Sequence, residues 1–577
     1  MKLWALLTPA LLTVLSAQTP PTPEQADEHA KKLCTLQGAV LNVFNQQPLR
    51  KAKVTLKPVI GSSSATPYST TTETDGKFTL EKVEPGRYTL FAEKEGFVRG
   101  NYGAARPMGM GATLQLKDTQ TLKELIVKLA AQGALTGRIS DAEGEPVRGV
   151  MVWALKTQVV LGHKRLVPAG APTITDDRGQ YRVSSLSPGK YFVVATAQTQ
   201  AALIQQPSAD AKAKKEKDGV DEGYALTYYP NSPDVTGASP VDLKVGTEEM
   251  KLDITMPKTR SFRLAGKVVN AVTNAAMKGV ILQLIAGQGD SLQTIPAAMR
   301  MVQAESGEFE FASVPAGSYT LFGISQALED PMAVQVPITV TDKNLEDVVV
   351  SLGAGSDLPV TSKLEGAGPD GQIPSTVKDA KPLTPAGARL ILRLRENAAI
   401  GMATVVIDKD NKALLKKLTA ERYNLTVVAV PEGLYLKSAR LGPIDAVEGI
   451  LDTRSAPANA SLDLVFAQTS AEFTATVRND KGEPVPGAIV TLIAKRADLF
   501  RSAAADQDGS VKVSSLAPGD YQVFAWEDLE GDSAEDEDFR KPFNSRAVKV
   551  SLTESAHKNQ TLVMITRDVV EQAQAGR

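Results

Sequence analysis

Cysteine, histidine and aromatic residues are scarce in this sequence. Cys34 is the only cysteine, 3 histidines occur in 577 residues, and aromatic residues make up 5%. A single cysteine excludes an intrachain disulfide and a zinc site built from four cysteines or from two cysteines and two histidines. The cores of this protein must therefore depend on hydrophobic packing and not on covalent or metal cross-links.

An excess of either charge is also missing. The 64 lysines and arginines nearly balance the 66 aspartates and glutamates, and no long basic stripe is present. This charge balance excludes the electrostatic footprint of a nucleic-acid-binding protein. After the N-terminal region no apolar run approaches the length of a bilayer span, so we expect no transmembrane segment in the mature chain.

Glycine and proline are plentiful. The chain contains 44 Gly and 34 Pro with 42% hydrophobic residues, which is typical of many turns between short strands and predicts an all-β fold. At the N-terminus, Met1 is followed by Lys2, the apolar run Leu3 to Leu15, and Ser16 and Ala17. This layout predicts a signal peptide over residues 1–17 and hence an exported protein, periplasmic, cell-surface or extracellular.

One pattern recurs along the chain. Its clearest copy, Thr175 to Ala195, reads TDDRGQYRVSSLSPGKYFVVA: a turn with glycine, an alternating strand, a Pro-Gly turn and an apolar strand. A degenerate copy ends at Tyr423 and has Asn411 at the turn position. In the four good copies a turn glycine precedes a tyrosine by 12 residues: Gly76 and Tyr88, Gly179 and Tyr191, Gly307 and Tyr319, Gly509 and Tyr521.

We interpret these residues as structural. Each tyrosine follows a tight turn, as in a tyrosine corner, where the hydroxyl bonds back to the backbone at a sheet edge. The tyrosines recur at about the length of one β-sandwich, so the chain is predicted to be a tandem array of about five such domains. The predicted segments are a signal peptide 1–17, a leader 18–35, sandwich 1 at 36–131, sandwich 2 at 132–258 with a long insertion at 198–223, sandwich 3 at 259–353, a linker or long loop at 354–386, a divergent sandwich 4 at 387–468, sandwich 5 at 469–567 and a tail at 568–577.

Two motifs resemble a known family. The hairpin of Gly137 to Val152 (GRISDAEGEPVRGVMV) and the pattern of Asp176 to Tyr191 are similar to those of carboxypeptidase regulatory-like domains. These are transthyretin-like (prealbumin-like), Ig-like β-sandwiches related to the B-type repeats of collagen adhesins. The resemblance implies the fold, and only loosely a function, because such sandwiches serve as stalks, accessory domains and binding modules.

The resemblance also implies two chemistries that the residues do not support. An adhesin-type Lys–Asn cross-link needs a lysine on the first strand with a nearby glutamate. Glu93 and Glu527 are placed for the acid, but their modules lack that lysine, and Lys267 lacks a matching glutamate. The zinc peptidase of the carboxypeptidases is a separate domain, and no His-x-x-Glu accompanies any of the three histidines, His29, His163 and His557.

Other chemical motifs are weak. Ser375 to Lys378 (STVK) matches Ser-x-x-Lys by chance occurrence, without a Lys-Thr-Gly partner. Asp506 to Gly509 begins like a calcium loop, but Ala517 stands at position twelve, so a plain turn is predicted. The acidic segment 527–538 is predicted to be a solvated loop in preference to a weak calcium site. We therefore predict no catalytic, cofactor-binding or metal-binding residues.

One aromatic group is a candidate ligand surface. Tyr224, Tyr228 and Tyr229 are the densest cluster of tyrosines, whereas Trp153 and Trp526 lie on strands and are predicted to be core residues. The function favoured is a non-catalytic exported scaffold that presents loops to a protein or polysaccharide partner not identifiable from the residues. The alternative is a carbohydrate-binding protein, and a hydrolase is disfavoured. Whether the domains form a rigid rod or a jointed chain remains open.

Overall fold

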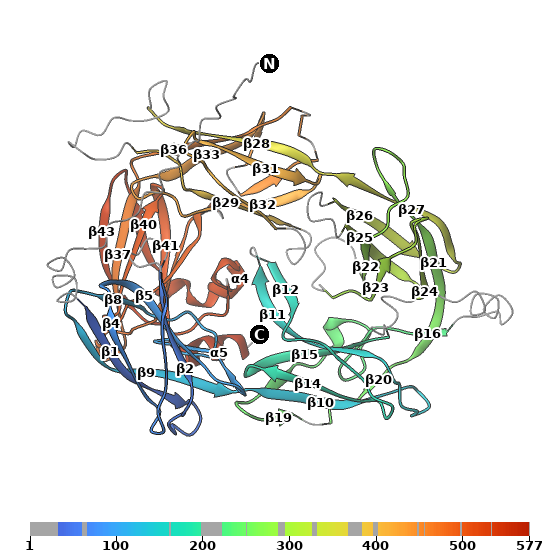
Figure 1. Cartoon of the computed structure of the whole chain (residues 1–577), viewed down its shortest axis with the longest axis horizontal. Coiled ribbons are helices and arrows are strands. Elements are labelled where there is room, and N and C mark those ends of the chain that lie inside the picture. Colours follow the sequence, from blue (N-terminus) through green and yellow to red (C-terminus); the bar gives the residue numbers. More distant parts are fainter. Residues whose placement is uncertain are drawn as a thin grey trace, which may run out of the picture.

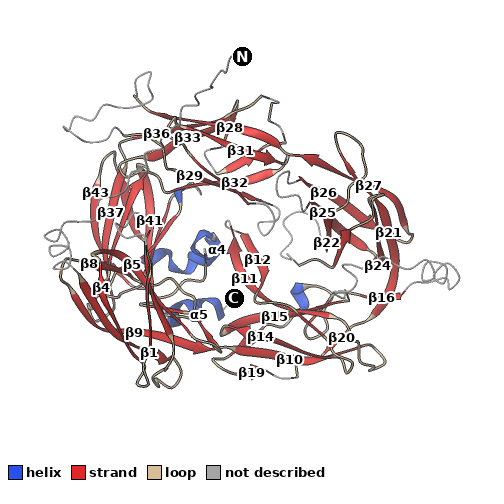
Figure 2. Cartoon of the chain, in the orientation of Figure 1, coloured by secondary structure: helices blue, strands red, loops and turns tan. Residues whose placement is uncertain are grey.

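The structure is a computed structural model that confirms the all-β tandem array. It describes residues 33–59, 66–160, 163–197, 222–249, 251–286, 295–325, 332–366, 383–395, 402–446, 449–454, 456–457, 459–496, 499–531 and 533–575. Figure 2 shows that strands dominate these residues and that the few helices are short. The described residues form five β-sandwich modules.

Modules 1 and 2 cover 34–131 and 133–255. The strands of module 1 are β1 (Cys34–Asn42), β2 (Lys53–Pro58), β3 (Tyr68–Thr71), β4 (Lys77–Val83), β5 (Gly86–Glu93), β6 (Phe97–Val98), β7 (Gly100–Asn101), β8 (Thr113–Leu116) and β9 (Thr121–Ala131). Those of module 2 are β10 (Gly133–Ser140), β11 (Met151–Val160), β12 (His163–Pro168), β13 (Thr173–Ile174), β14 (Gln180–Leu186), β15 (Gly189–Thr196), β17 (Thr227–Tyr228), β18 (Val241–Leu243), β19 (Glu248–Glu249) and β20 (Ile254–Thr255), with a 3₁₀ helix η1 (Val235–Gly237).

Modules 3 and 4 cover 258–354 and 356–467. Module 3 contains β21 (Lys258–Asn270), β22 (Val280–Ala286), β23 (Ala298–Val302), β24 (Glu308–Pro315), β25 (Gly317–Ser325), β26 (Met332–Val340) and β27 (Leu345–Ala354), and it borrows β16 (Glu222–Tyr224) from the module 2 region. Module 4 contains β28 (Ser356–Leu364), β29 (Arg389–Leu394), β30 (Met402–Val406), β31 (Lys412–Leu418), β32 (Arg422–Val428), β33 (Tyr435–Leu441), β34 (Ile444–Asp445), β35 (Ile450–Asp452) and β36 (Leu462–Ala467).

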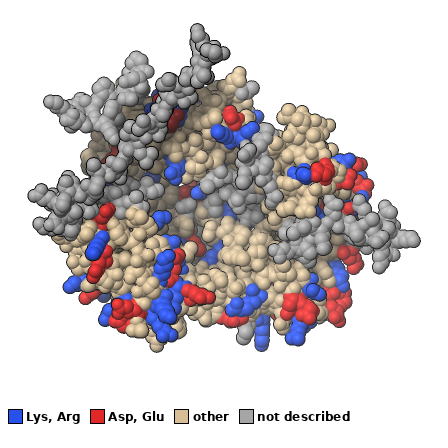
Figure 3. Space-filling model, in the orientation of Figure 1, with Lys and Arg blue, Asp and Glu red and all other residues tan. Residues whose placement is uncertain are grey.

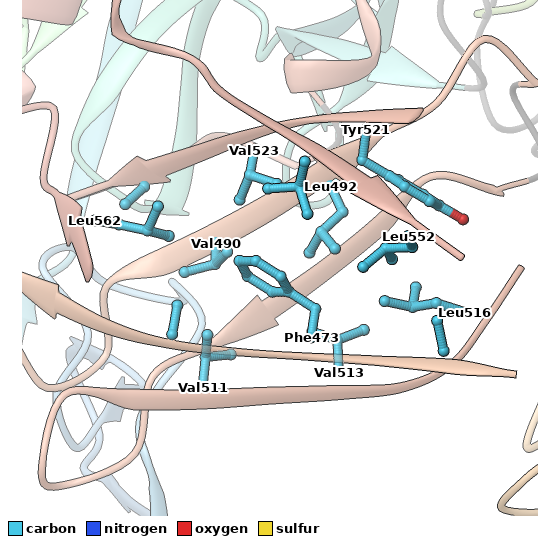
Figure 4. Close-up of a cluster of buried hydrophobic side chains, with 14 of the residues drawn as sticks. Phe473, Val490, Leu492, Val511, Val513, Leu516, Tyr521, Val523, Leu552 and Leu562 are labelled. Atoms are coloured by element: carbon cyan, nitrogen blue, oxygen red, sulfur yellow. The ribbon is translucent and has the colours of Figure 1, made fainter. Parts of the chain in front are cut away.

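Module 5 covers 471–563 and is followed by a helix. Its elements are β37 (Ala471–Arg478), β38 (Ile489–Ile493), β39 (Arg501–Ala504), β40 (Ser510–Leu516), β41 (Gly519–Trp526), η3 (Ser533–Glu535), α4 (Glu537–Arg540), η4 (Lys541–Arg546), β42 (Val548–Leu552), β43 (His557–Val563) and α5 (Arg567–Ala575). One sheet has the order β40-β37-β43 and the other β39-β38-β41-β42. Figure 4 shows Phe473, Val490, Leu492 and Tyr521 meeting between the two sheets. Alternate residues of each strand supply this core.

The turn glycine and the corner tyrosine have the same structural roles in the modules that carry them. Gly179 has φ +72°, and a Cβ there would lie 2.3 Å from the carbonyl oxygen of Ile139. In all five modules a tyrosine hydroxyl donates to the backbone carbonyl four residues earlier: Tyr88 to Glu84 at 2.8 Å, Tyr191 to Ser187, Tyr319 to Pro315 at 2.9 Å, Tyr423 to Thr419 at 3.1 Å and Tyr521 to Ala517 at 2.8 Å. This hydrogen bond ties the strand to the turn before it.

A second recurring device explains the glycine on the first strand. Gly137 lies opposite Tyr181, and a Cβ on it would approach the carbonyl oxygen of Leu252 on the last part of the module to 2.3 Å. Equivalent pairs are Gly38 with Phe78 and Gly266 with Phe309. In modules 5 and 4 the pairs are Ala475 with Val511 and Val360 with Ala413. A glycine thus faces an aromatic residue in modules 1 to 3, and an alanine faces a valine in modules 4 and 5, so the two side chains of each pair fill a similar volume.

The five modules follow one another around a ring. Module 1 (blue) and module 5 (orange to red) lie side by side, and the β11–β12 hairpin, α4 and α5 point toward the middle (Figure 1). Several contacts join the first and last modules, among them a hydrogen bond from the backbone N–H of Gln115 to Gln507 Oε1 at 2.9 Å. The chain is therefore neither a rod nor an open string. Basic and acidic residues are interspersed over the visible face (Figure 3).

Two segments differ from the sequence-based expectation. The sequence predicts a linker or long loop at 354–386, but β28 within it is a central strand that pairs with β31 and β36. Its Leu358, Val360 and Leu364 are buried in alternation, a signal that the surrounding Gly and Pro residues obscured. The predicted tail contains α5, whose Val569, Val570 and Ala573 pack against module 5.

Candidate functional site

The three tyrosines of the candidate ligand surface do not share one exposed patch. Tyr228 has an exposed fraction of 1% and packs with Leu155 and Val194 of module 2 and Ile295 of module 3. Tyr229 is half-buried against the core of module 2, and Tyr224 lies on β16, beside Lys258. These residues join modules 2 and 3, because an aromatic side chain gains more by packing than by facing water.

The weak chemical motifs are placed as follows. Ser375 to Lys378 and residues 198–221 lie outside the described residues, as does the predicted signal peptide. The Asp506 carboxylate accepts the backbone N–H groups of Asp508 and Ser510, both within its own turn. Within the described ranges no cluster of three or more His, Cys, Asp or Glu residues is arranged to hold a metal ion.

Lys267 lies in a surface hollow of about 360 Å³ on the outer face of module 3. Cations and carboxylates alternate there: Arg263 Nη1 lies 3.7 Å from Glu310 Oε2, and Lys267 Nζ lies 4.0 Å from Glu308 Oε1. Because these charges neutralise one another, the hollow has no electrostatic preference for a ligand of one sign.

Modules 2 and 5 each cover the outer face of the sheet that contains the strand of the corner tyrosine, β15 or β41. We call this sheet the second sheet of a module. In module 5, Phe524 and Trp526 on β41 pack beneath Phe543 and α5, and the Trp526 indole donates to Thr491 Oγ1 at 2.9 Å. In module 2 the equivalent face carries Val194 and, on the adjacent strand β17, Tyr228, and both pack in one apolar cluster with Ile295 of module 3 and the partly buried Val235. In both modules the connection after the corner tyrosine contributes to this apolar packing.

The acidic segment 527–538 is not a solvated loop. Arg106 of module 1 reaches it: its Nε lies 2.9 Å from Asp528 Oδ1, and its Nη2 donates to the backbone carbonyl of Leu529 at 2.5 Å. Only 24% of the Arg106 side chain and 12% of the Asp528 side chain are exposed. Glu530 Oε1 lies 3.6 Å from Arg106 Nη1. One guanidinium thus makes three contacts across the joint between the first and last modules.

Module 2 joins the same segment. Lys164 on β12 lies 3.5 Å from Asp536, whose side chain also accepts the backbone N–H of Asp538 at the start of α4. Close backbone approach supports the joint, since a Cβ on Gly487 of module 5 would lie 2.0 Å from the carbonyl oxygen of Gly103 in module 1. We call the contacts of Arg106, Lys164, Asp528, Glu530 and Asp536 the closure joint.

Burial controls the electrostatics of the closure joint. Burial raises the pKa of the Asp528 carboxyl above its ordinary value of 3.8, while Arg106 and Arg567 act in the opposite direction. Burial lowers the pKa of the nearby Lys156 ammonium, and Glu530 partly offsets this. Burial thus disfavours the charged forms of Asp528 and Lys156. Attraction to Arg106 and to Glu530, respectively, offsets this desolvation cost only while the joint is closed. Sequence patterns could not reveal Arg106, because it lies outside the repeated motif.

Comparison with protein families identifies part of the chain. Residues 35–123 and 134–215 match the family model described as carboxypeptidase regulatory-like domain. Modules 1 and 2 carry this domain. The resemblance expected from the hairpin and turn motifs is thereby confirmed for these two carboxypeptidase regulatory-like modules. No curated protein matches the chain.

Solved structures of two pilins and of one further bacterial protein show distant likeness. The Bacillus anthracis TIE protein is 16% identical, with 56% of this chain and 51% of that chain covered and a TM-score of 0.17. This chain thus spans about half the length of that protein. A streptococcal ancillary pilin is 15% identical over 56% of this chain and 99% of its own, with a TM-score of 0.16. A minor pilin of Streptococcus agalactiae is 13% identical over 40% and 96%, with a TM-score of 0.22. At these TM-scores the likenesses carry no argument about this chain.

Proposed function

We propose that this chain is a non-catalytic, exported scaffold protein whose five sandwiches form a closed ring that presents its module-specific segments to a protein partner. The observation that carries the proposal is the closure joint, in which Arg106 contacts Asp528, Leu529 and Glu530 across the two ends of the array. A ring holds its modules at fixed positions, whereas a string of domains lets them move.

Several features fit a scaffold. The side chains repeated in all copies, the corner tyrosines and the turn glycines, serve the fold of each module. The connections that differ between copies form the joints and the covers of the outer faces. None of the helices in the described part is long and apolar enough to cross a bilayer. The predicted signal peptide supports an envelope or extracellular location.

Two experiments test the proposal: one measures the overall shape of the chain, and the other measures how well it captures a protein partner. Small-angle scattering of the full chain should give a radius of gyration above the value of about 25 Å for a compact chain of this length, but well below that of an extended row of modules, which would be roughly twice the compact value. Cross-linking of the full chain in the envelope fraction should then capture a partner that an Arg106→Ala variant with intact modules captures less well. Extended scattering, or equal capture by both proteins, would reject the ring scaffold.

A further inference from the structure

The outer face of the second sheet in module 1 differs from its counterparts in modules 2 and 5. The residue three places after the corner tyrosine is Phe91 in module 1, Val194 in module 2 and Phe524 in module 5. Val194 packs in an apolar cluster with Tyr228 and Ile295, and Phe524 packs in one with Trp526 and Phe543. Phe91 is covered instead by Arg99, whose guanidinium carbon lies 3.5 Å from the ring centroid. A cation thus occupies the place of an apolar cover.

Arg99 lines a surface hollow of about 370 Å³ with Phe97, Lys51 and Lys53, and Glu93 and Glu95 also line it. The Arg99 Nε is buried and has no hydrogen-bond partner among the described residues. No carboxylate in the described ranges forms an ion pair with Arg99, Lys51 or Lys53. We call this surface the Arg99 face.

The geometry of Arg99 favours one kind of ligand group. The Arg99 guanidinium lies over the Phe91 ring, and its planar fork of N–H donors matches the two oxygens of a carboxylate. Stacking also restricts the side chain before binding, so less conformational freedom is lost when a partner docks. Lys51 and Lys53 add positive charge beside it and would attract an anion.

Glu93 and Glu95 in the hollow favour a protein partner over an anionic polysaccharide. Glu93 and Glu95 would repel a polyanion that carries a charge on every unit, such as a polyuronate. A protein surface with one carboxylate between basic residues would complement both the cations and the acids. A peptide that adds a strand to a sheet needs an exposed edge, whereas this site lies on a sheet face and would bind through side chains.

We propose that the Arg99 face is a docking site for a protein partner that inserts a carboxylate side chain, held by the Arg99 guanidinium and flanked by Lys51 and Lys53. The site lies within module 1, so it does not depend on ring closure. Failure of this inference and failure of the ring scaffold are therefore distinguishable.

The test uses the full chain and saturation-transfer difference NMR, which suits weak ligands of a large protein. The probe is a seven-residue peptide with one central glutamate and a lysine two residues away on each side, compared with the same peptide carrying glutamine. We expect the glutamate peptide to bind about tenfold more tightly than the glutamine peptide. Arg99→Ala should weaken its binding about tenfold and Arg99→Lys by a smaller factor, because lysine keeps the charge but loses the planar fork.

Arg87→Ala is the matched control, since Arg87 is exposed on the same strand and the same face but away from the hollow. Lys53→Ala, at a second exposed position, supplies a variant that keeps Arg99 stacked and should weaken binding severalfold. Absence of binding of the glutamate peptide, or an equal loss in Arg87→Ala, would overturn the proposal. Tighter, Arg99-dependent binding of polygalacturonate than of the peptide would assign the face to an acidic polysaccharide and also overturn it.

Discussion

Removal of the Arg106 guanidinium tests the closure joint most directly. In Arg106→Ala, Asp528 loses a charged partner at 2.9 Å while its side chain stays 12% exposed as long as the ring is closed. Breaking a fully buried ion pair by removing one partner costs about 3–5 kcal/mol. Since Arg106 is about a quarter exposed, solvent screens part of the interaction, and we expect a loss of roughly 2–3 kcal/mol in the free energy of closure. This corresponds to a shift of roughly 30- to 150-fold toward the open form.

Hydrogen exchange measured by mass spectrometry would report this shift, since the loop 102–112 carries Arg106 and contacts module 5. Protection of that loop should fall, while protection within the cores of the modules stays unchanged. Arg178→Ala, at an exposed turn of module 2, is the matched control. Adding Asp528→Asn to Arg106→Ala should restore part of the closure, because it removes the charge left without its partner.

The pH dependence of Arg106→Ala follows from the raised pKa of Asp528. A carboxyl whose pKa is raised in the closed form binds its proton more tightly there than in the open form. Closure therefore becomes more favourable as the pH falls toward that pKa, and the defect of Arg106→Ala should be smaller at about pH 4 than at pH 7. Unchanged protection of 102–112 in Arg106→Ala at pH 7, or a defect at about pH 4 as large as the defect at pH 7, would refute the reasoning.

Three further predictions concern the modules and one of their joints. Tyr191→Phe removes the hydroxyl that donates to Ser187 and should cost about 1 kcal/mol in module 2, visible as faster exchange of β15, whereas Tyr102→Phe, outside the repeated corners, should leave β15 unaffected. Gly137→Ala forces a Cβ toward the Leu252 carbonyl and should destabilise module 2 by about 1–3 kcal/mol in the same assay; a smaller effect than that of Thr136→Ala would contradict the close-approach argument. Lys258 holds the pKa of the Asp141 carboxyl below its ordinary value of 3.8, so the stability this pair gives to the joint of modules 2 and 3 is present above pH 3.8 and lost as the pH falls through the folded pKa; a Lys258→Met variant should lose this dependence, and an unchanged profile would exclude the pair as its cause.

The module fold could be read from the residues because its determinants are short-range. Gly179 and Tyr191 stand 12 residues apart, and the turn and the corner hydrogen bond that they form involve neighbouring chain. Alternation of apolar residues shows which face of each strand is buried. The same approach missed β28, since Pro359 and its Gly-rich surroundings resemble a linker, and it treated α5 as a tail.

The candidate site was less accessible to sequence reasoning. Tyr228 reads as a surface aromatic, yet Ile295 of the next module covers it. The stacked Arg99 on Phe91 depends on how the connection after β5 folds back, and no spacing rule predicts such a contact.

The sequence by itself determined that the chain is a series of β-sandwiches closed by tyrosine corners, because period-two alternation and turn chemistry act over a few residues and recur in each copy. Only the tertiary structure decided that the series forms a ring. Arg106 and Leu529 are separated by 423 positions. Their contact depends on the summed angles between successive modules. The two residues that make it each occur in only one copy, so the repeated pattern does not predict them.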